Sequence, residues 1–585
     1  MLTQLPRRLA QSMLLLLSVG GAVLFGAQVA TWPDHPLADM THVTHWVRNI
    51  GEYGQETAYS GVYPESYMIY PPGMTYAYRA SLFFADRLPP FPGVAESEWL
   101  RVCIKLVPVL AHGILAAAVF GLAAIAAGFW RGWIAATLYA WSPGALFDSA
   151  YWGQGDTINI ALLALALLAI FALPSWWPLR HEGRWRLLAQ PGAVVASAAA
   201  GVLIAAAGLT KPQSWVFLPI LLWVILRRGG PLGLVAAAAT GTASVLAIVQ
   251  PWVRAGRVDE MLTVFTNVTQ VMPSVSANAH NLWWLKLPGV ALAVFDTVPV
   301  GGFGEWVAPP LVSHATVGRL GFALFAMLPL LRLTGPLSVR LAMACCAYTS
   351  AAYFMAVTQV HENHMFAVLP FLAVTAALDL WFLIPFAIAT VCVFLNMAIH
   401  DFLIGDHLAL ALAQWLPWKE PLAIQTANAQ LNVLGFAVFT LLLLRRPPVI
   451  PQSARLLRWR ARFVLLLGTV LSAGMLATVR AIASEPQRAL ALWERVRERA
   501  MLAGPIEAHL GHKSPPQVLL ERAALDFANG LYLLAGVAAV VGALSCGAGA
   551  WWLICAWVTE WRARPVRSPQ MRAIRQATTD PVPAT

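Results

Sequence analysis

The sequence contains little charge. Only 11% of its 585 residues are Asp, Glu, Lys or Arg, whereas these residues make up about a quarter of a typical soluble protein. Hydrophobic residues account for 59% of the chain, 25 residues are tryptophan, and the mean hydropathy is +0.64. This composition excludes a water-soluble protein and predicts an all-α protein that crosses the lipid bilayer many times.

Cysteine is also scarce, and its placement excludes two kinds of site. The six cysteines lie inside apolar stretches, at positions 103, 345, 346, 392, 546 and 555. Disulfide frameworks and zinc sites usually place cysteines as spaced pairs in loops. The histidines of His361-Glu362-Asn363-His364 are three residues apart rather than the four of the His-Glu-x-x-His zinc motif. The spacing therefore predicts neither a disulfide framework nor a zinc site; no metal site and no cofactor are assigned, and the metal requirement stays open.

Basic residues exceed acidic ones, and the formal net charge is +11. They concentrate in a few loops between apolar segments, which is typical of cytoplasmic loops in membrane proteins and not of nucleic-acid binding. About fourteen apolar segments approach the roughly 20 residues of a spanning helix. Their centres lie near residues 18, 115, 137, 165, 198, 217, 238, 323, 347, 368, 389, 437, 468 and 539. We predict about 12–14 spans. We also predict a cytoplasmic N-terminus, because counting alternate crossings from that side places nearly every Arg-rich loop in the cytoplasm.

Counting crossings from that N-terminus places several polar segments on the external face. They are the loop 31–100, which holds Asp39 and Tyr70-Pro71-Pro72, the segments Tyr151-Trp152-Gly153-Gln154-Gly155-Asp156, Thr210-Lys211-Pro212-Gln213 and His361-Glu362-Asn363-His364, and the loop 251–315, which holds Asn278 and Asn281. Acids, amides, a lysine, histidines and aromatic rings on one face predict a site at the membrane boundary.

Each polar segment by itself has an ordinary structural interpretation. Asp156 begins the fourth predicted span, where a carboxylate caps a helix N-terminus. Lys211 ends the fifth predicted span, where a cation suits the helix dipole and its ammonium can extend to water. Most of the tryptophans belong to the interfacial belt of a membrane protein, and Asp39 is one of several acids in its loop. The hypothesis of a site therefore rests on the combination.

The order of these motifs resembles the GT-C glycosyltransferases that use polyprenyl-phosphate sugars. The motifs are an Asp in the first external loop, Tyr-Pro-Pro near its end, Trp-Gly-Gln-x-Asp, Lys-x-Gln, Asn-x-x-Asn-Leu-Trp and His-Glu. The chain most resembles bacterial integral-membrane proteins related to GPI mannosyltransferase II, and more distantly the dolichyl-phosphate-glucose-dependent glucosyltransferases. The resemblance covers roughly residues 10–445. It departs from the pattern at Ile69, where the glucosyltransferases have an acid, and at His112, where an Asp is common.

The resemblance implies a reaction and a set of residue roles. An inverting transfer would move a hexose, with mannose favoured, from a polyprenyl-phosphate donor to a hydroxyl of a glycan, lipid or protein, on the external face of a bacterial inner or plasma membrane. Asp39 would be the general base. Lys211 and His361 would be candidate cations for the leaving phosphate. The remaining implied substrate contacts are His45, Trp46, Tyr70, Gln154, Asp156, Gln213, Asn278, Asn281 and Glu362.

The predicted organisation has two parts. Residues 1–445 form the catalytic module, and residues 446–585 form an extension with two spans, an external amphipathic segment at 484–529 and a basic cytoplasmic tail at 558–585. Two other functions stay open. A transporter or lipid-linked-sugar flippase would place ionisable residues along several spans, and a membrane scaffold would retain the motifs of the family without its activity.

Overall fold

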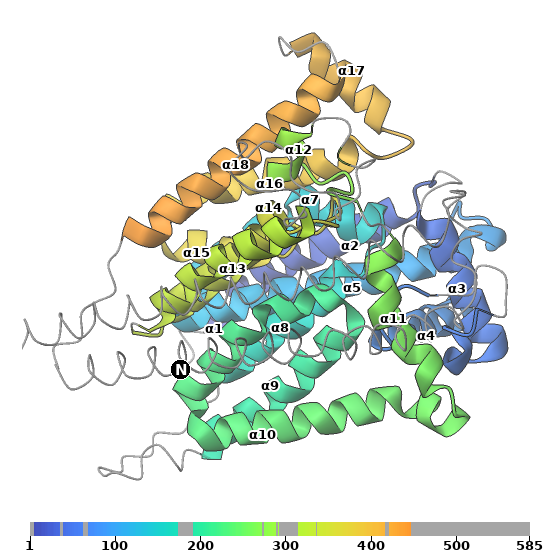
Figure 1. Cartoon of the computed structure of the whole chain (residues 1–585), viewed down its shortest axis with the longest axis horizontal. Helices are drawn as coiled ribbons and strands as arrows, with labels where there is room; N and C mark the ends of the chain where they lie inside the picture. The colour runs from blue at the N-terminus through green and yellow to red at the C-terminus, as the bar shows by residue number, and fades with distance from the viewer. Residues whose placement is uncertain are drawn as a thin grey trace, which may run out of the picture. The chain divides into compact units, whose positions relative to one another are not determined.

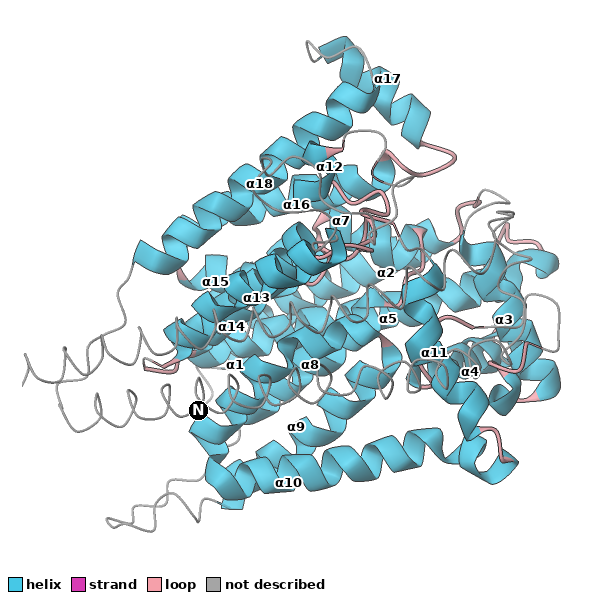
Figure 2. Ribbon diagram, in the orientation of Figure 1, coloured by secondary structure: helices cyan, strands magenta, loops and turns pink. Residues whose placement is uncertain are grey.

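The computed structural model describes residues 5–34, 39–61, 68–172, 191–271, 274–287, 291, 314–334, 336–415 and 421–445. All of them belong to one compact unit of the chain. Within these ranges the regular structure is helical apart from isolated bridges that join residues 277 and 278 to His361 (Figure 2). The predicted spans near residues 468 and 539, the segment 484–529 and the tail 558–585 lie outside the described residues.

The described helices are labelled in chain order in Figure 1. Their bounds are α1 Leu5–Leu15, a π-helical turn Leu16–Gly20, α2 Gly21–Ala30, α3 Asp39–Tyr53, α4 Gly73–Arg87, α5 Glu96–Ala127, α6 Phe129–Ala140, α7 Pro143–Leu146, a π-helical turn Phe147–Tyr151, α8 Asp156–Ala172, α9 Pro191–Thr210, α10 Leu218–Ala255, α11 Val258–Val271, α12 Leu282–Lys286, α13 His314–Leu333, α14 Val339–Ala356, α15 Val368–Leu378, α16 Leu383–Ala398, α17 Gly405–Trp415 and α18 Pro421–Arg445.

Eight of the described helices are long and apolar enough to cross a membrane, and a bent helix pair brings the number to nine. The prediction of an all-α protein with many membrane spans is confirmed. The described residues hold fewer spans than predicted, because the segments near residues 137 and 368 form helices of only 12 and 11 residues and those near residues 217 and 238 lie in one helical stretch, Pro212–Ala255. Pro143 explains the first of these, since the residue before a proline is disfavoured in helical geometry and α6 ends at Ala140.

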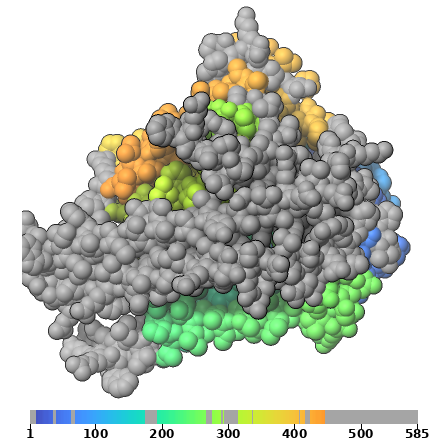
Figure 3. Space-filling view, viewed as in Figure 1, coloured from blue at the N-terminus to red at the C-terminus, as the bar shows by residue number. Residues whose placement is uncertain are grey.

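The long helix α10 contains the two spans predicted near residues 217 and 238. Gly230 interrupts it with a left-handed φ of 65°, a conformation that favours glycine. Gly229 lies against Ser197 in the first turns of α9, whereas Gly201, further along α9, lies against Ala237. The part of α10 before Gly230 therefore runs antiparallel to α9, and the part after Gly230 runs parallel to α9. The second arm lies at the surface of the face drawn in Figure 3.

A second interruption shapes the site. The pieces Pro143–Tyr151 and Asp156–Ala172 are bent by 119° relative to each other. The turn between them contains Gly153, which has a φ of 68°. Glycine adopts this backbone conformation without the steric cost that a Cβ atom would bring. The polar Trp-Gly-Gln-Gly-Asp sequence is therefore the turn of a bent helix pair, which has the form of a broken span or of a re-entrant loop.

The amphipathic helices α3 and α4 lie with α11 at one end of the bundle (Figure 1). The buried face of α3, formed by Met40, Val43, Trp46, Val47 and Ile50, packs into an apolar cluster with Ile104 of α5 and Trp252 of α10. A helix with one apolar stripe is stabilised by burying that stripe against its neighbours. This packing brings the first residue of α3 to the glycine turn.

Candidate active site

Asp39 is the first residue of α3, and its side chain is exposed. The Nε2 of Gln154 donates a hydrogen bond to Asp39 Oδ2 at 3.2 Å, and the hydroxyl of Tyr70 donates to Gln154 Oε1 at 3.2 Å. The ring of Trp46 meets the Tyr70 ring edge to face at 5.9 Å. The side-chain amide of Gln154 therefore links its own segment to those of Asp39 and Tyr70, and it orients the carboxylate of Asp39.

A cleft opens beside Asp39, and the space within it and at its mouth, part of it open to solvent, is about 390 Å³. It lies among α3, α4, α5 and the glycine turn. Its lining consists of Asp39, Met40, Val43, Tyr70, Met74, Ala77, Tyr78, Ser81, Ile104, Val107, Pro108, Trp152, Gly153, Gln154, Gly155 and Ile158. A concave apolar space with a few converging polar groups is the usual form of a small-molecule site.

A buried ion pair lies next to this cleft. Lys211 is 3% exposed and Asp156 is 5% exposed. Lys211 Nζ is 2.5 Å from Asp156 Oδ2, to which Asn363 Nδ2 also donates at 2.7 Å. Lys211 therefore does not extend to water as the ordinary interpretation expected. Removing one partner of such a pair typically costs about 3–5 kcal/mol, because the other charge stays buried.

The segment from His361 to His364 lies beside the same ion pair. The backbone N–H of His361 donates to His364 Nδ1 at 3.2 Å, and the amide nitrogen of Gln213 lies 2.7 Å from His364 Nε2. Asn396 Nδ2 donates to the carbonyl oxygens of Glu362 at 2.9 Å and Asn278 at 3.2 Å. These contacts hold the segments around Gln213, Asn278 and His361 together.

Burial sets the charge states of this segment. Burial lowers the pKa of His361 to about 4, although the nearby Asp39 opposes the change. Burial raises the pKa of Glu362 to about 8, and Asp39 adds to the increase. At neutral pH the His361 imidazole is therefore neutral and the Glu362 carboxyl keeps its proton. His361 does not supply the positive charge that we considered for it, which leaves Lys211 as the buried cation of the site.

No family model matches the sequence, and no curated protein sequence matches it. Solved structures of the oligosaccharyltransferase of Archaeoglobus fulgidus align with it. The archaeal enzyme AglB in complex with an inhibitory peptide and a dolichol-phosphate gives a TM-score of 0.32 at 13% identity, over 76% of this chain and 58% of that one. The form tethered to an acceptor peptide gives 0.32 at 14% identity, over 76% and 57%. The apo form gives 0.31 at 15% identity, over 76% and 58%.

The likeness assigns no family. The aligned region is less than two-thirds of the archaeal chain, and the TM-scores are too low for the alignment to support a conclusion about fold or function.

Of the residues predicted to bind substrate, Tyr70 and Gln154 line the cleft, and the others lie outside its lining. Asn281 is fully buried; its Oδ1 accepts the backbone N–H groups of Trp283 and Trp284, and its Nδ2 donates to the carbonyl of Phe354. Both ends of this amide hold the fold, so we leave Asn281 out of the proposed contacts. His45 is partly buried on α3 and does not line the cleft.

The two positions that depart from the family pattern have structural surroundings. His112 is 1% exposed. Its Nε2 lies 3.0 Å from the carbonyl oxygen of Ala140, and its ring lies 4.8 Å from that of Tyr139. It joins α5 to α6 within the bundle. Ile69 is partly buried and packs against the apolar cluster of α3 and α4. Neither residue lines the cleft.

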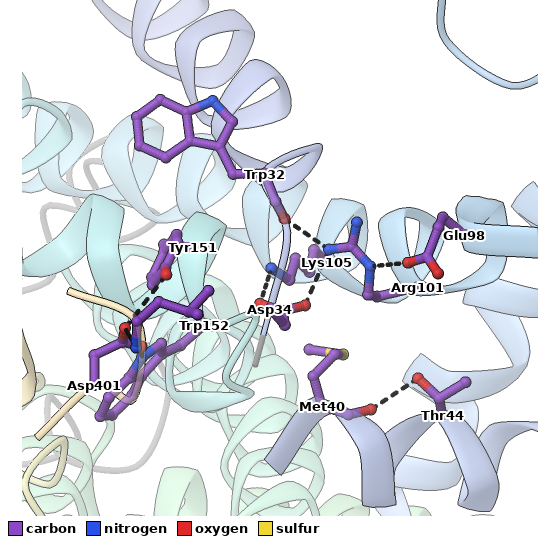
Figure 4. Close-up of polar contacts among 11 residues, drawn as sticks. Trp32, Asp34, Met40, Thr44, Glu98, Arg101, Lys105, Tyr151, Trp152 and Asp401 are labelled. Carbon is purple, nitrogen blue, oxygen red and sulfur yellow. Dashed lines mark hydrogen bonds and ion pairs between the residues drawn. The ribbon is translucent and has the colours of Figure 1, made fainter. Parts of the chain in front are cut away.

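Sequence reasoning missed the polar groups that support the glycine turn. Lys105 on α5 is wholly buried, and its Nζ lies 2.6 Å from Asp34 Oδ1. Arg101 Nη1 lies 2.9 Å from Asp34 Oδ2 and also donates to the carbonyl of Trp32 (Figure 4). The sequence did contain an indication of this pair: Lys105 lies inside an apolar run, and a buried cation in a membrane span requires a partner.

Asp401 supports the turn from the other side. Its carboxylate accepts hydrogen bonds from the hydroxyl of Tyr151 at 3.3 Å and from Trp152 Nε1 at 2.9 Å (Figure 4). Asp148 was missed as well. It is wholly buried, and neither of its oxygens makes a hydrogen bond within 3.5 Å among the described residues.

Proposed function

We propose that this protein is an inverting glycosyltransferase. It would move a hexose, with mannose favoured, from a polyprenyl-phosphate donor to an acceptor hydroxyl on the external face of the membrane. One observation carries the proposal: the exposed carboxylate of Asp39 is oriented by Gln154 at the edge of a cleft, beside the buried cation Lys211. The order of motifs shared with the GT-C glycosyltransferases is consistent with it.

Asp39 would act as the general base in a single displacement. Its carboxylate takes the proton of the acceptor hydroxyl while the hydroxyl oxygen bonds to the anomeric carbon of the sugar. The bond between that carbon and the phosphate oxygen breaks on the opposite side, and the polyprenyl phosphate leaves with the electron pair. Attack and departure on opposite faces invert the configuration of the anomeric carbon.

Lys211 would stabilise the leaving phosphate. An ammonium group has three N–H donors, and Asp156 accepts one of them in the structure. A further donor directed at the phosphate would stabilise the charge that grows as the bond breaks. Glu362, whose pKa is raised to about 8, would add a neutral hydrogen-bond donor on the same side. Its proton avoids repulsion between a second carboxylate and the phosphate.

The proposal is tested by measuring transfer of labelled sugar from polyprenyl-phosphate mannose and polyprenyl-phosphate glucose by the purified protein. Asp39→Asn should lower the rate about 10²- to 10⁴-fold, the usual contribution of a general base. Glu52→Gln is the matched control, because Glu52 is an exposed acid on the same helix. Full activity of Asp39→Asn would exclude Asp39 as the base. Absence of transfer by the wild type with every donor would contradict the proposed reaction.

The broken span favours a second candidate function. Transporters bind substrates at discontinuous helices near the bilayer midplane, and here Asp148 and Asp156 lie on the two pieces of a span bent by 119°. A lipid-linked-sugar flippase would move a fluorescent polyprenyl-phosphate sugar between the leaflets of a liposome without consuming it. Movement without transfer, lost in Asp156→Asn, would replace the first proposal with this one.

A further inference from the structure

The cleft beside Asp39 has an unusual charge for a site in an enzyme that handles phosphate. Among the described residues that line it, Asp39 is the sole acid, and none is lysine, arginine or histidine. Half of the lining is aliphatic side chains, methionine or proline, contributed by Met40, Val43, Met74, Ala77, Ile104, Val107, Pro108 and Ile158. The polar groups of the cleft are those of Asp39, Tyr70, Tyr78, Ser81, Trp152 and Gln154.

The two buried cations nearest to this cleft are both paired with carboxylates, although the Lys211 ammonium lies 5.8 Å from the centre of the Tyr70 ring, which lines the cleft. The stem of Lys105 lies directly under Gly153, yet its ammonium is paired with Asp34 at 2.6 Å and is wholly buried (Figure 4). The ammonium of Lys211 is paired with Asp156 at 2.5 Å. Neither lysine lines the cleft. The negative charge of Asp39 is therefore the charge that an occupant of the cleft would meet.

An anionic group in this cleft would be repelled. Two like charges at close range near a protein surface repel each other, and no lysine or arginine of the lining offsets this. The phosphate of a lipid-linked donor is joined directly to its isoprenoid chain, so the first isoprene units cannot occupy the cleft without bringing the phosphate close to Asp39. The donor must bind on the side of Asp39 where Lys211 and Glu362 lie.

We propose that the cleft binds the acceptor, and that the acceptor is an uncharged alcohol with an apolar body next to its reactive hydroxyl, such as a neutral glycolipid. This inference rests on the proposed function, because it takes Asp39 as the base that faces the acceptor. The hydroxyl lies against Asp39, Tyr70 and Gln154, and the apolar body lies against α3, α4 and α5. A free sugar lacks that body, and a phosphorylated sugar meets an uncompensated carboxylate.

The experiment uses the full chain in nanodiscs, a polyprenyl-phosphate donor with a labelled sugar, and three acceptors: octyl glucoside, glucose and glucose 6-phosphate. Transfer to octyl glucoside should show a KM at least about tenfold below that for glucose, since each buried methylene contributes about 0.8 kcal/mol. Transfer to glucose 6-phosphate should be lower than to glucose. Hydrolysis of the donor without acceptor is measured in parallel as a readout that needs no acceptor.

Ala77→Phe separates binding in the cleft from simple partition of the alkyl chain into the bilayer. Ala77 is a partly buried residue of α4 that lines the cleft, whereas Ala80 on the same helix does not line it. Ala77→Phe should remove the preference for octyl glucoside. Ala80→Phe should keep the preference.

The failures of the two proposals are distinguishable. If the wild type neither transfers sugar to an acceptor nor hydrolyses the donor, the proposed reaction is wrong. If it does either, yet uses glucose or glucose 6-phosphate as well as octyl glucoside, the acceptor assignment is overturned and the reaction stands. A preference for octyl glucoside that persists in a folded Ala77→Phe protein also overturns it.

Discussion

At the scale of single residues, the site contains two carboxyl groups in different environments. Asp39 is exposed and accepts a hydrogen bond from Gln154. Glu362 is partly buried, and its pKa is raised to about 8. Two carboxyl groups whose surroundings separate their protonation states can take different parts in one reaction. Asp39 suits a base, and Glu362 suits a neutral donor.

The raised pKa of Glu362 predicts a stability that depends on pH. The unfolded chain loses this proton near the ordinary pKa of 4.5, whereas the folded protein keeps it up to about pH 8. The contribution of Glu362 to stability is therefore full below about pH 4.5 and is lost as pH rises to about 8. Glu362→Gln cannot ionise and removes this dependence.

Thermal unfolding of both proteins in the same detergent between pH 4.5 and pH 9 measures the effect. The melting temperature of the wild type should fall relative to that of Glu362→Gln as pH rises, and the difference should level off above about pH 8. His361 has the opposite slope between about pH 4 and 6.5 because its pKa is lowered, but both proteins contain it. A constant difference across the range would contradict the buried, protonated state of Glu362.

At the scale of the elements, the broken span brings the cleft and the ion pair together. Its glycine turn carries Gln154 toward Asp39 and begins α8 with Asp156. Both carboxylates then lie on one side of the bundle although they come from separate helices. The sequence analysis placed residues 151–156 as an external connection between the spans centred near residues 137 and 165, and it did not predict the bend, because a positive φ at one glycine leaves no signature in hydropathy.

Gly153→Ala should disturb this turn through two separate effects. A Cβ atom at a positive φ costs about 1–2 kcal/mol, and at Gly153 it would also lie 2.7 Å from Lys105 Cγ and from Met40 Cε. The Met40 methyl group can move, but the Lys105 stem is held by its ion pair with Asp34. The substitution should destabilise the protein and displace Gln154.

Gly256→Ala is the matched control, because Gly256 has a φ of 67° with no atom within 4 Å of the added Cβ. Unfolding by heat or denaturant should show a loss for Gly153→Ala larger than the roughly 1–2 kcal/mol expected from backbone strain alone. Equal losses for the two variants would mean that Lys105 and Met40 yield without cost.

At the scale of the whole molecule, α5 is long enough to cross the whole bilayer. Its 32 residues rise about 1.5 Å each, about 48 Å in all, which exceeds the roughly 30 Å of a hydrocarbon core. Arg101 and Lys105 near its first turns bind Asp34, which precedes α3. The N-terminal end of α5 therefore lies on the side of the candidate site. The distribution of Arg-rich loops predicts that this side is external.

Single cysteines at the two ends of α5 test the predicted orientation. Ser97 and Ala127 are both exposed. An impermeant maleimide added to intact cells should label Ser97→Cys, and it should label Ala127→Cys only after permeabilisation. The cysteines at 103, 345, 346 and 392 are buried and give little background, and those at 546 and 555 are replaced by serine. The reverse labelling would place the candidate site on the cytoplasmic face.

The sequence by itself determined that this is an all-α protein with many membrane spans, because apolar runs of about 20 residues in water-free surroundings can satisfy their backbone groups only as helices. It also predicted that Asp39, Tyr70, Gln154, Asp156, Lys211 and Glu362 lie near one another, since the spans alternate in direction.

Only the tertiary structure decided the charges of these groups. Burial makes His361 neutral and keeps Glu362 protonated. Lys211 pairs with Asp156, which lies 55 residues away in the sequence. Lys105 likewise forms an ion pair with Asp34, which is distant in the sequence. Desolvation and pairing depend on which helices pack together, and hydropathy along the chain does not contain that information.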